Sequence, residues 1–164
     1  MILGARHVGF VVSNLLYSKA FYEGLGFRSE GSANTETGEK TSTLVGVADV
    51  VIQTLKLSLS ESEEGIWREG GFRIELIEYV TPLSNRANLN NNNFIGRGHL
   101  CFTVKSIPEV VEKALSLGGT APYSPVLDES GLPGAIYILD PDGIPIELSK
   151  NQKYGVLSVS PKSF

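Results

Sequence analysis

The two histidines of this 164-residue chain each begin the same short pattern. His7 opens His-Val-Gly-Phe-Val-Val and His99 opens His-Leu-Cys-Phe-Thr-Val, so Phe and Val recur at the same distances from each histidine. The tripeptide Ile-Glu-Leu also occurs twice, once downstream of each histidine, and it contains Glu75 and Glu147. Imidazole and carboxylate together are donors that zinc, nickel, iron, cobalt and manganese accept. The repeat therefore predicts a divalent metal site made of His7, Glu75, His99 and Glu147.

Four expected β-strands must position these side chains. Their segments are rich in β-branched and aromatic residues, and they cover Ala5–Ser13, Phe72–Val80, His99–Val104 and Pro145–Ser149. Residues two apart on a strand share a face, so each proposed ligand has a defined side of its sheet. If the two halves of the chain pair their sheets by pseudo-symmetry, we expect the four ligands to converge in one cleft.

The remaining elements give each half the order strand, helix, strand, strand, strand. Helices are expected at Leu15–Leu25 and Pro108–Leu117, and the other strands at Phe27–Gly31, within Thr43–Leu57, near Thr120–Pro122 or slightly beyond, and at Ala135–Leu139. A polar loop through Lys40 and an acidic loop at Ser58–Gly71 separate strands of the first half, and Asp140–Gly143 predicts a tight turn. We expect a first βαβββ module at 1–80, an Asn-rich linker at 81–97, a second module at 98–150 and a tail at 151–164. The class predicted is α+β, with the open faces of the two sheets meeting.

Composition excludes several classes of function. The net charge of −4 and the pI near 5.2 do not favour electrostatic binding to nucleic acid or to an anionic membrane. No apolar stretch approaches the ~20 residues that span a bilayer. The single cysteine cannot form an internal disulfide, and no basic segment followed by an apolar run begins the chain. We therefore expect a cytoplasmic protein that binds neither nucleic acid nor membrane.

Three further side chains have open interpretations. Cys101 lies two residues after His99 and could supply a soft ligand, although a small buried residue is the favoured interpretation. Arg73 and Tyr137 lie on strands of the expected cleft and could meet an anionic substrate, with surface pairing and core packing as equal alternatives. A single strand histidine or glutamate is more often structural than a ligand, so the metal hypothesis depends on the double repeat.

The chain resembles the vicinal oxygen chelate superfamily, which includes glyoxalase I, methylmalonyl-CoA epimerase, fosfomycin-resistance proteins, extradiol dioxygenases and bleomycin-binding proteins. The matching segments are His7-Val-Gly-Phe-Val-Val, Phe21-Tyr-Glu-Gly-Leu-Gly-Phe27, Ile74-Glu-Leu-Ile-Glu-Tyr79, Gly98-His-Leu-Cys-Phe-Thr-Val104 and Leu139-Asp-Pro-Asp-Gly-Ile-Pro-Ile-Glu-Leu148. The resemblance implies tandem βαβββ modules whose sheets form a barrel-like metal-binding cleft. It places the family's ligand positions on His7, Glu75, His99 and Glu147.

The resemblance also implies an activity. The glyoxalase-like and epimerase-like branches fit the ligand set best, and they predict a metal-dependent lyase or isomerase that removes a proton next to a carbonyl of a small chelating substrate. Glu147 would act as the base, with Glu75 as its pseudo-symmetric partner, and the ion would be nickel, cobalt, zinc, manganese or iron. A non-haem iron dioxygenase and a resistance-type protein that sequesters its ligand remain alternatives. Family members build the cleft within one chain or between two chains, and we expect a homodimer.

Overall fold

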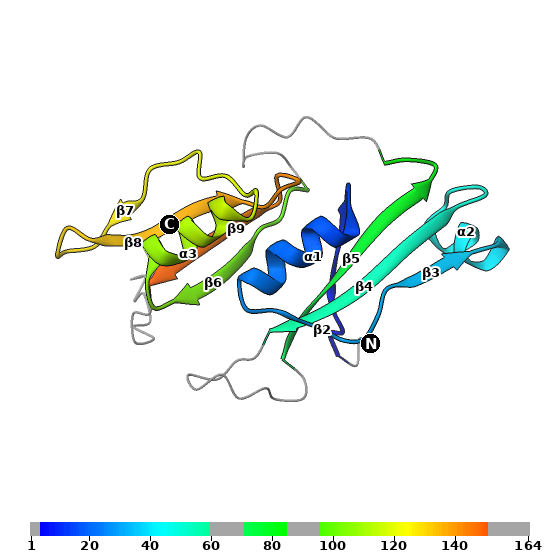
Figure 1. Cartoon of the computed structure of the whole chain (residues 1–164), viewed down its shortest axis with the longest axis horizontal. Helices are drawn as coiled ribbons and strands as arrows, with labels where there is room; N and C mark the ends of the chain where they lie inside the picture. The colour runs from blue at the N-terminus through cyan, green and yellow to red at the C-terminus, as the bar shows by residue number, and fades with distance from the viewer. Residues whose placement is uncertain (1–3, 60–70, 85–95, 151–164) are drawn as a thin grey trace, which may run out of the picture.

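Two β-sheets and three helices make up the computed structural model, which describes residues 4–59, 71–84 and 96–150 (Figure 1). The first half contains β1 (Val8–Val12), α1 (Leu15–Gly24), β2 (Arg28–Ser29), β3 (Asn34–Thr37), α2 (Glu39–Val45), β4 (Val51–Leu59) and β5 (Phe72–Thr81). The second contains β6 (Leu100–Val104), α3 (Ile107–Ser116), β7 (Val126–Leu127), β8 (Pro133–Leu139) and β9 (Pro145–Lys150). The α+β class is confirmed.

The two sheets have the same core topology. In the first, the order is β1-β5-β4-β2, with β3 also paired to β4; in the second it is β6-β9-β8-β7. The strand that opens each half pairs in parallel with the strand that ends it, β1 with β5 and β6 with β9. The antiparallel hairpin partner then lies on the other side, β4 beside β5 and β8 beside β9. Strand pairing therefore repeats between the two halves, as the sequence repeat predicts.

The long helices begin and end at sequence signals. Asn14 caps α1, because its side-chain oxygen accepts a hydrogen bond from the backbone N–H of Tyr17 at 2.8 Å. Ser106 caps α3 in the same way through the N–H of Glu109 at 3.4 Å. Gly118 follows α3 with a φ of 87°, a left-handed conformation that favours glycine. Both helices were predicted within one residue of these ends.

The segment between α1 and β4 differs from the prediction. Its polar residues form a strand, β3, and a short helix, α2, where a loop and the beginning of a strand were expected. Polar Asn34–Thr37 joins the sheet because it pairs along β4, where the Thr54 hydroxyl donates to Glu36 at 3.1 Å. The strand expected within Thr43–Leu57 begins at Val51 and extends through Leu59. The acidic-loop, linker and C-terminal-tail predictions concern mainly residues 60–70, 85–95 and 151–164, which lie outside the described residues.

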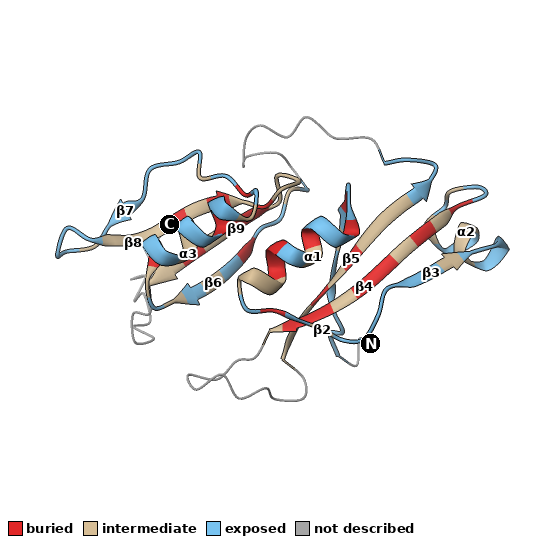
Figure 2. Ribbon diagram, in the orientation of Figure 1, coloured by how far each residue is buried: buried red, intermediate tan, exposed pale blue. Residues whose placement is uncertain are grey.

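One hydrophobic core unites the two halves. The inward residues of β4 and β5 pack in the same cluster as those of β6, β8 and β9, and α1 lies between the two sheets (Figure 1). Burial in Figure 2 is accordingly strongest along α1 and the strands that flank it. Three rings join the halves: Phe102 lies 5.7 Å from Phe27 and 5.9 Å from Phe72, measured between ring centroids. Burial of large aromatic side chains provides much of the stability of such a core.

A buried hydrogen bond also crosses between the halves. The hydroxyl of Tyr22, in α1, donates to Asp140 Oδ2 at 3.0 Å, and Asp140 is only 2% exposed. Asp140 Oδ1 accepts from the backbone N–H groups of Asp142 and Ile144 at 2.9 and 2.8 Å. These bonds hold the turn before β9, and the hydrogen bond from Gly143 N to Asp140 O confirms the predicted tight turn.

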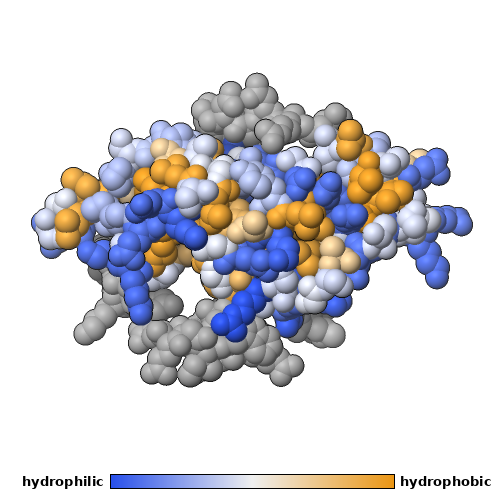
Figure 3. Space-filling view, viewed as in Figure 1, coloured by the Kyte–Doolittle hydropathy of each residue, from blue (hydrophilic) through white to orange (hydrophobic). Residues whose placement is uncertain are grey.

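The way in which the halves meet contradicts one expectation. The helix-covered faces of the sheets share the core, whereas the prediction placed the open faces against each other. The described strands form two separate sheets and no closed barrel. On the face of the molecule in Figure 3, hydrophobic residues form patches between hydrophilic ones. Within the described residues, no helix has the length and apolar character needed to cross a membrane.

Candidate functional site: two histidine–glutamate pairs

The first pair, His7 and Glu75, lies on the open face of the first sheet. Glu75 is in β5 and faces away from the core because its neighbours Ile74 and Leu76 are the fully buried ones. His7 immediately precedes β1, whose Gly9 is the register partner of Glu75. His7 Nε2 lies 3.0 Å from Glu75 Oε2, and the two side chains are 29% and 16% exposed. His7 and Glu75, two of the four predicted ligands, therefore lie in contact.

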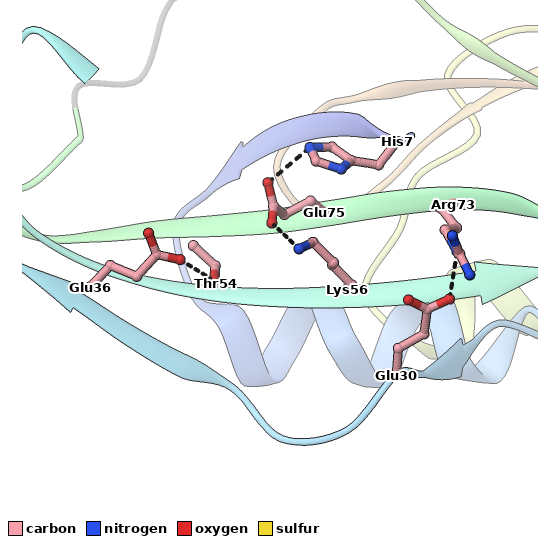
Figure 4. Close-up of polar contacts among 7 residues, drawn as sticks. All are labelled: His7, Glu30, Glu36, Thr54, Lys56, Arg73 and Glu75. Atoms are coloured by element: carbon pink, nitrogen blue, oxygen red, sulfur yellow. Dashed lines mark hydrogen bonds and ion pairs between the residues drawn. The ribbon is translucent and has the colours of Figure 1, made fainter. Parts of the chain in front are cut away.

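A lysine completes this half of the site. Lys56 lies directly opposite Glu75 on the neighbouring strand β4, and its Nζ is 3.5 Å from Glu75 Oε1. Figure 4 shows Glu75 between His7 and Lys56, with a separate carboxylate oxygen directed to each. The sequence analysis missed Lys56, since only the register between β4 and β5 brings it beside Glu75.

The second pair, His99 and Glu147, has the same arrangement on the second sheet. His99 Nε2 lies 3.3 Å from Glu147 Oε2. The hydroxyl of Tyr137, opposite Glu147 on β8, donates to the same oxygen at 2.9 Å. Its ring stands edge-on to the His99 ring, with centroids 5.3 Å apart. Burial and the nearby Glu147 raise the pKa of Tyr137 to about 12, so the phenol stays protonated and remains a donor.

The two pairs are equivalent in register but differ in their neighbours. Lys56 and Tyr137 occupy matching positions opposite the glutamates, and Gly9 and Cys101 occupy matching positions on the opening strands. Cys101 is exposed, so the expectation that it is a buried residue is wrong. Partial desolvation and the charge of Glu147 raise the pKa of its thiol. A raised pKa makes Cys101 a poorer thiolate ligand at neutral pH.

Within one chain the four proposed ligands do not converge. Among the residues that the structure describes, no group of three or more His, Cys, Asp or Glu side chains is placed to hold a metal ion. Each pair belongs to the open face of its own sheet, and the shared core separates the two faces. One chain therefore carries two half-sites, each consisting of one imidazole and one carboxylate.

Arg73 and a hollow near β5 complete the open face of the first sheet. For Arg73, the sequence left open a contact with substrate or a surface ion pair. The structure shows an ion pair, in which Arg73 Nε donates to Glu30 Oε1 at 2.7 Å. A hollow of about 400 Å³ lies farther along β5 and was not predicted. Its lining residues come from β1, β5, the loop after β5 and the loop between α2 and β4: Val11, Val47, Tyr79, Pro82, Leu83 and Ser84.

The donor atoms of each pair have the separation that a metal site requires. Ligand atoms ~2.1 Å from an octahedral ion lie ~3.0 Å apart when they are adjacent, and ~3.4 Å apart in a tetrahedral site. The Nε2–Oε2 separations of 3.0 and 3.3 Å fall in this range. Both imidazoles present Nε2, a common metal donor. The residues present therefore fit half of a divalent cation site on each sheet.

Comparisons with known proteins support the fold described above. The structure of a glyoxalase family protein from Bacillus cereus matches with a TM-score of 0.74 and 25% identity, over 92% of this chain and 95% of that chain. Glyoxalase I from Leishmania major matches with a TM-score of 0.55 and 21% identity, over 90% of this chain and 87% of that one. A mutant of the fosfomycin resistance protein FosX from Listeria monocytogenes, complexed with Mn(II), matches at 0.53 and 18%, over 93% and 96% of the two chains. The last two likenesses show the fold alone.

Sequence comparison places the chain in a family. No curated protein matches it. The model of the Glyoxalase/Bleomycin resistance protein/Dioxygenase superfamily, however, matches residues 4–148, a span that includes both His–Glu pairs. The chain therefore belongs to the Glyoxalase/Bleomycin resistance protein/Dioxygenase superfamily.

Proposed function

We propose that this protein is a divalent-metal-dependent lyase or isomerase that removes a proton next to a carbonyl of a small oxygen-chelating substrate. The observation that carries the proposal is the repetition of one His–Glu pair at equivalent register in both sheets, with donor separations of 3.0 and 3.3 Å. His7, Glu75, His99 and Glu147 together offer two imidazoles and two carboxylates. That set suits nickel, cobalt, zinc, manganese or iron.

The ion, when bound, supplies a Lewis acid that stabilises negative charge developing on a substrate oxygen. Glu147 is the better base of the two glutamates, because its contacts are a phenol and an imidazole, whereas Glu75 also faces the ammonium group of Lys56. Tyr137 orients the Glu147 carboxylate by donating to Oε2 and leaves Oε1 for a substrate proton. His7 and His99, which immediately precede β1 and β6, contact the two carboxylates.

A complete site then requires a second copy of the chain. The core already occupies the helix-covered faces, so the open face of the first sheet can meet the open face of the second only in a partner molecule. An exposed apolar residue on the same face as the first pair supports such a contact: Val11 is 50% exposed and lies two residues after Gly9, the register partner of Glu75. A two-fold homodimer arranged in this way contains two equivalent sites, each with one pair from either chain.

Metal content tests the proposal most directly. Protein purified without affinity-tag metals should contain about one nickel, cobalt, zinc or manganese ion per chain. The Glu75→Ala, Glu147→Ala double variant should lose it, whereas Glu112→Ala, which removes an exposed glutamate of α3, should retain it. Iron would favour a dioxygenase, tested by oxygen consumption. A protein that takes up no metal on titration would contradict the proposal and favour a ligand-sequestering protein.

A mixing experiment tests the two-chain site. His7→Ala and His99→Ala should each lose metal binding and turnover when pure. In a mixed dimer, one site receives both substitutions and the other receives neither. Random reassortment should therefore restore about a quarter of the sites. No recovery in a mixture shown to contain mixed dimers, or full activity of His99→Ala alone, would contradict the assignment.

A further inference from the structure

We propose that Lys56 makes the first half-site an anion-binding subsite, so that the substrate carries a single negative charge next to its chelating oxygens. This inference rests on the proposed function, because it concerns the same metal site. It adds a residue that sequence analysis did not find and a charge class for the substrate.

The position of Lys56 is fixed by the sheet. It is the register partner of Glu75 and lies on the same open face. Its Nζ approaches Glu75 Oε1 at 3.5 Å, while His7 Nε2 approaches Oε2 at 3.0 Å. The lysine side chain is 43% exposed, so its ammonium group lies at the open edge of the pair. Anything that binds to His7 and Glu75 therefore has a cation beside it.

Stability gives little reason for a lysine at this position. Exposed ion pairs contribute little to the stability of a protein, and cross-strand pairs contribute about as little. Arg73, another cation of this face, has a closer partner in Glu30, with Nε to Oε1 at 2.7 Å. The contact between Lys56 Nζ and Glu75 Oε1 is longer, at 3.5 Å. Lys56 is thus more readily available than Arg73 to a ligand at the first half-site.

Metal binding would change the surroundings of Lys56. Glu75 is its ionic partner, and a divalent ion held by Glu75 and His7 neutralises that carboxylate. The ammonium group then lies beside a second cation, an unfavourable arrangement unless an anion enters between them. A carboxylate or similar group of the substrate is the simplest such anion, since it can approach Nζ while neighbouring oxygens approach the metal position.

The charges of the complete site specify a monoanion. Two neutral imidazoles, two carboxylates and one divalent ion sum to zero. Tyr137 adds no charge, because a phenol is neutral at pH 7. Lys56 leaves a net charge of one positive, which one negative charge on the substrate balances. Tyr137 replaces lysine at the equivalent position of the second sheet, so only one side of the complete site has this cation.

The test compares two ligands that differ in charge. Pyruvate and its neutral amide, pyruvamide, are titrated into Mn(II)-loaded protein, and water-proton relaxation reports their binding to the metal site. Wild type should prefer pyruvate. Lys56→Gln should bind pyruvate about 10- to 100-fold more weakly, the usual effect of losing a charged hydrogen bond. It should bind pyruvamide as wild type does, and Lys56→Arg should recover the preference.

Two further measurements separate this role from a structural one. Mn(II) affinity, measured without ligand, should stay the same or rise in Lys56→Gln, because Glu75 no longer has a competing cation. Lys19→Gln is the matched control, since Lys19 also forms an ion pair, with Glu23 on α1, but lies outside the half-site. It should leave the affinities for pyruvate, pyruvamide and Mn(II) unchanged.

The outcomes separate a failure of the anion-subsite proposal from a failure of the proposed metal-dependent function. Equal affinity of wild type for pyruvate and pyruvamide, or unchanged pyruvate binding by Lys56→Gln, would overturn the role of Lys56 and leave the metal site intact. Loss of Mn(II) binding in Lys56→Gln would overturn it as well. If wild type binds no divalent metal, the proposed function fails and the anion subsite fails with it.

Discussion

Replacing Asp140 by Asn should remove a specific pH dependence of stability. Burial raises the pKa of Asp140 to about 6 from the usual 3.8, against the opposing effect of its hydrogen bonds from Ile144, Tyr22 and Asp142. The carboxyl group is 2% exposed, at the junction of the two halves. Asn retains an oxygen that can accept the two backbone hydrogen bonds, and its amide can donate to the Tyr22 hydroxyl.

The sign and size of the effect follow from linkage. Because the folded-state pKa lies above the unfolded one, protonation favours the folded state. The stabilisation is complete below about pH 4 and is lost as the pH rises through about 6. The full difference corresponds to about 3 kcal/mol. Of this, about 1 kcal/mol should be lost between pH 5 and pH 7.5.

Denaturant unfolding at these two pH values, at one protein concentration, measures the effect. Asp140→Asn should lose about 1 kcal/mol less than wild type between pH 5 and pH 7.5. Asp49→Asn makes the same chemical change at an exposed position with a φ of 51°, which Asn tolerates, and should keep the wild-type dependence. Equal pH dependence in wild type and Asp140→Asn would refute the reasoning.

Two other substitutions test the site and the junction. Tyr137→Phe removes the hydrogen bond to Glu147 and should weaken Mn(II) binding about 10- to 100-fold; unchanged affinity in a titration would show that the phenol does not support the ligand. Gly119→Ala should destabilise the protein by about 1–3 kcal/mol. The new Cβ would lie 2.8 Å from Leu139 O and from Phe21 Cε2, whereas in Gly4→Ala it meets no atom within 4 Å. A Gly119→Ala unfolding midpoint equal to that of Gly4→Ala would contradict the close packing.

The sequence repeat singled out residues that the structure brings into contact, but it did not predict how they are grouped. His7, Glu75, His99 and Glu147 were expected to converge in one cleft, because each histidine and glutamate recurs at the same place in a repeat, whereas the structure shows two separate contacts, His7 with Glu75 and His99 with Glu147. Lys56 could not be predicted, because its distance from Glu75 depends on which residue of β4 stands opposite β5. Hydrophobic periodicity specifies the buried face of each strand and excludes a one-residue slip, but a two-residue slip leaves the same face buried, so the pattern does not identify the residue that stands opposite Glu75.

The sequence pattern also could not predict which faces of the two sheets pack together. Alternation along β5 shows that Ile74 and Leu76 are buried and that Glu75 is not. It does not show whether the surface that covers them is a helix of the same half or the other half of the chain. In the structure the other half of the chain provides part of this cover, because Phe27 and Phe102 pack against each other across the junction. Polar β3 was missed for a related reason, since its pairing with β4 outweighs a weak local strand propensity.

The shared core has a consequence for how the chain folds. The hydrogen bond between Tyr22 and Asp140 joins residues 118 positions apart, and the one from Ser13 N to Asp142 Oδ2 spans 129. Contacts of such high sequence separation close large loops before they gain energy, so they slow the search for the native state. Neither repeat, synthesised alone, would cover its own apolar side. The apolar surface of the first half therefore stays partly exposed to water until the turn at Asp140–Gly143 has left the ribosome. During that interval the chain is most prone to misassembly.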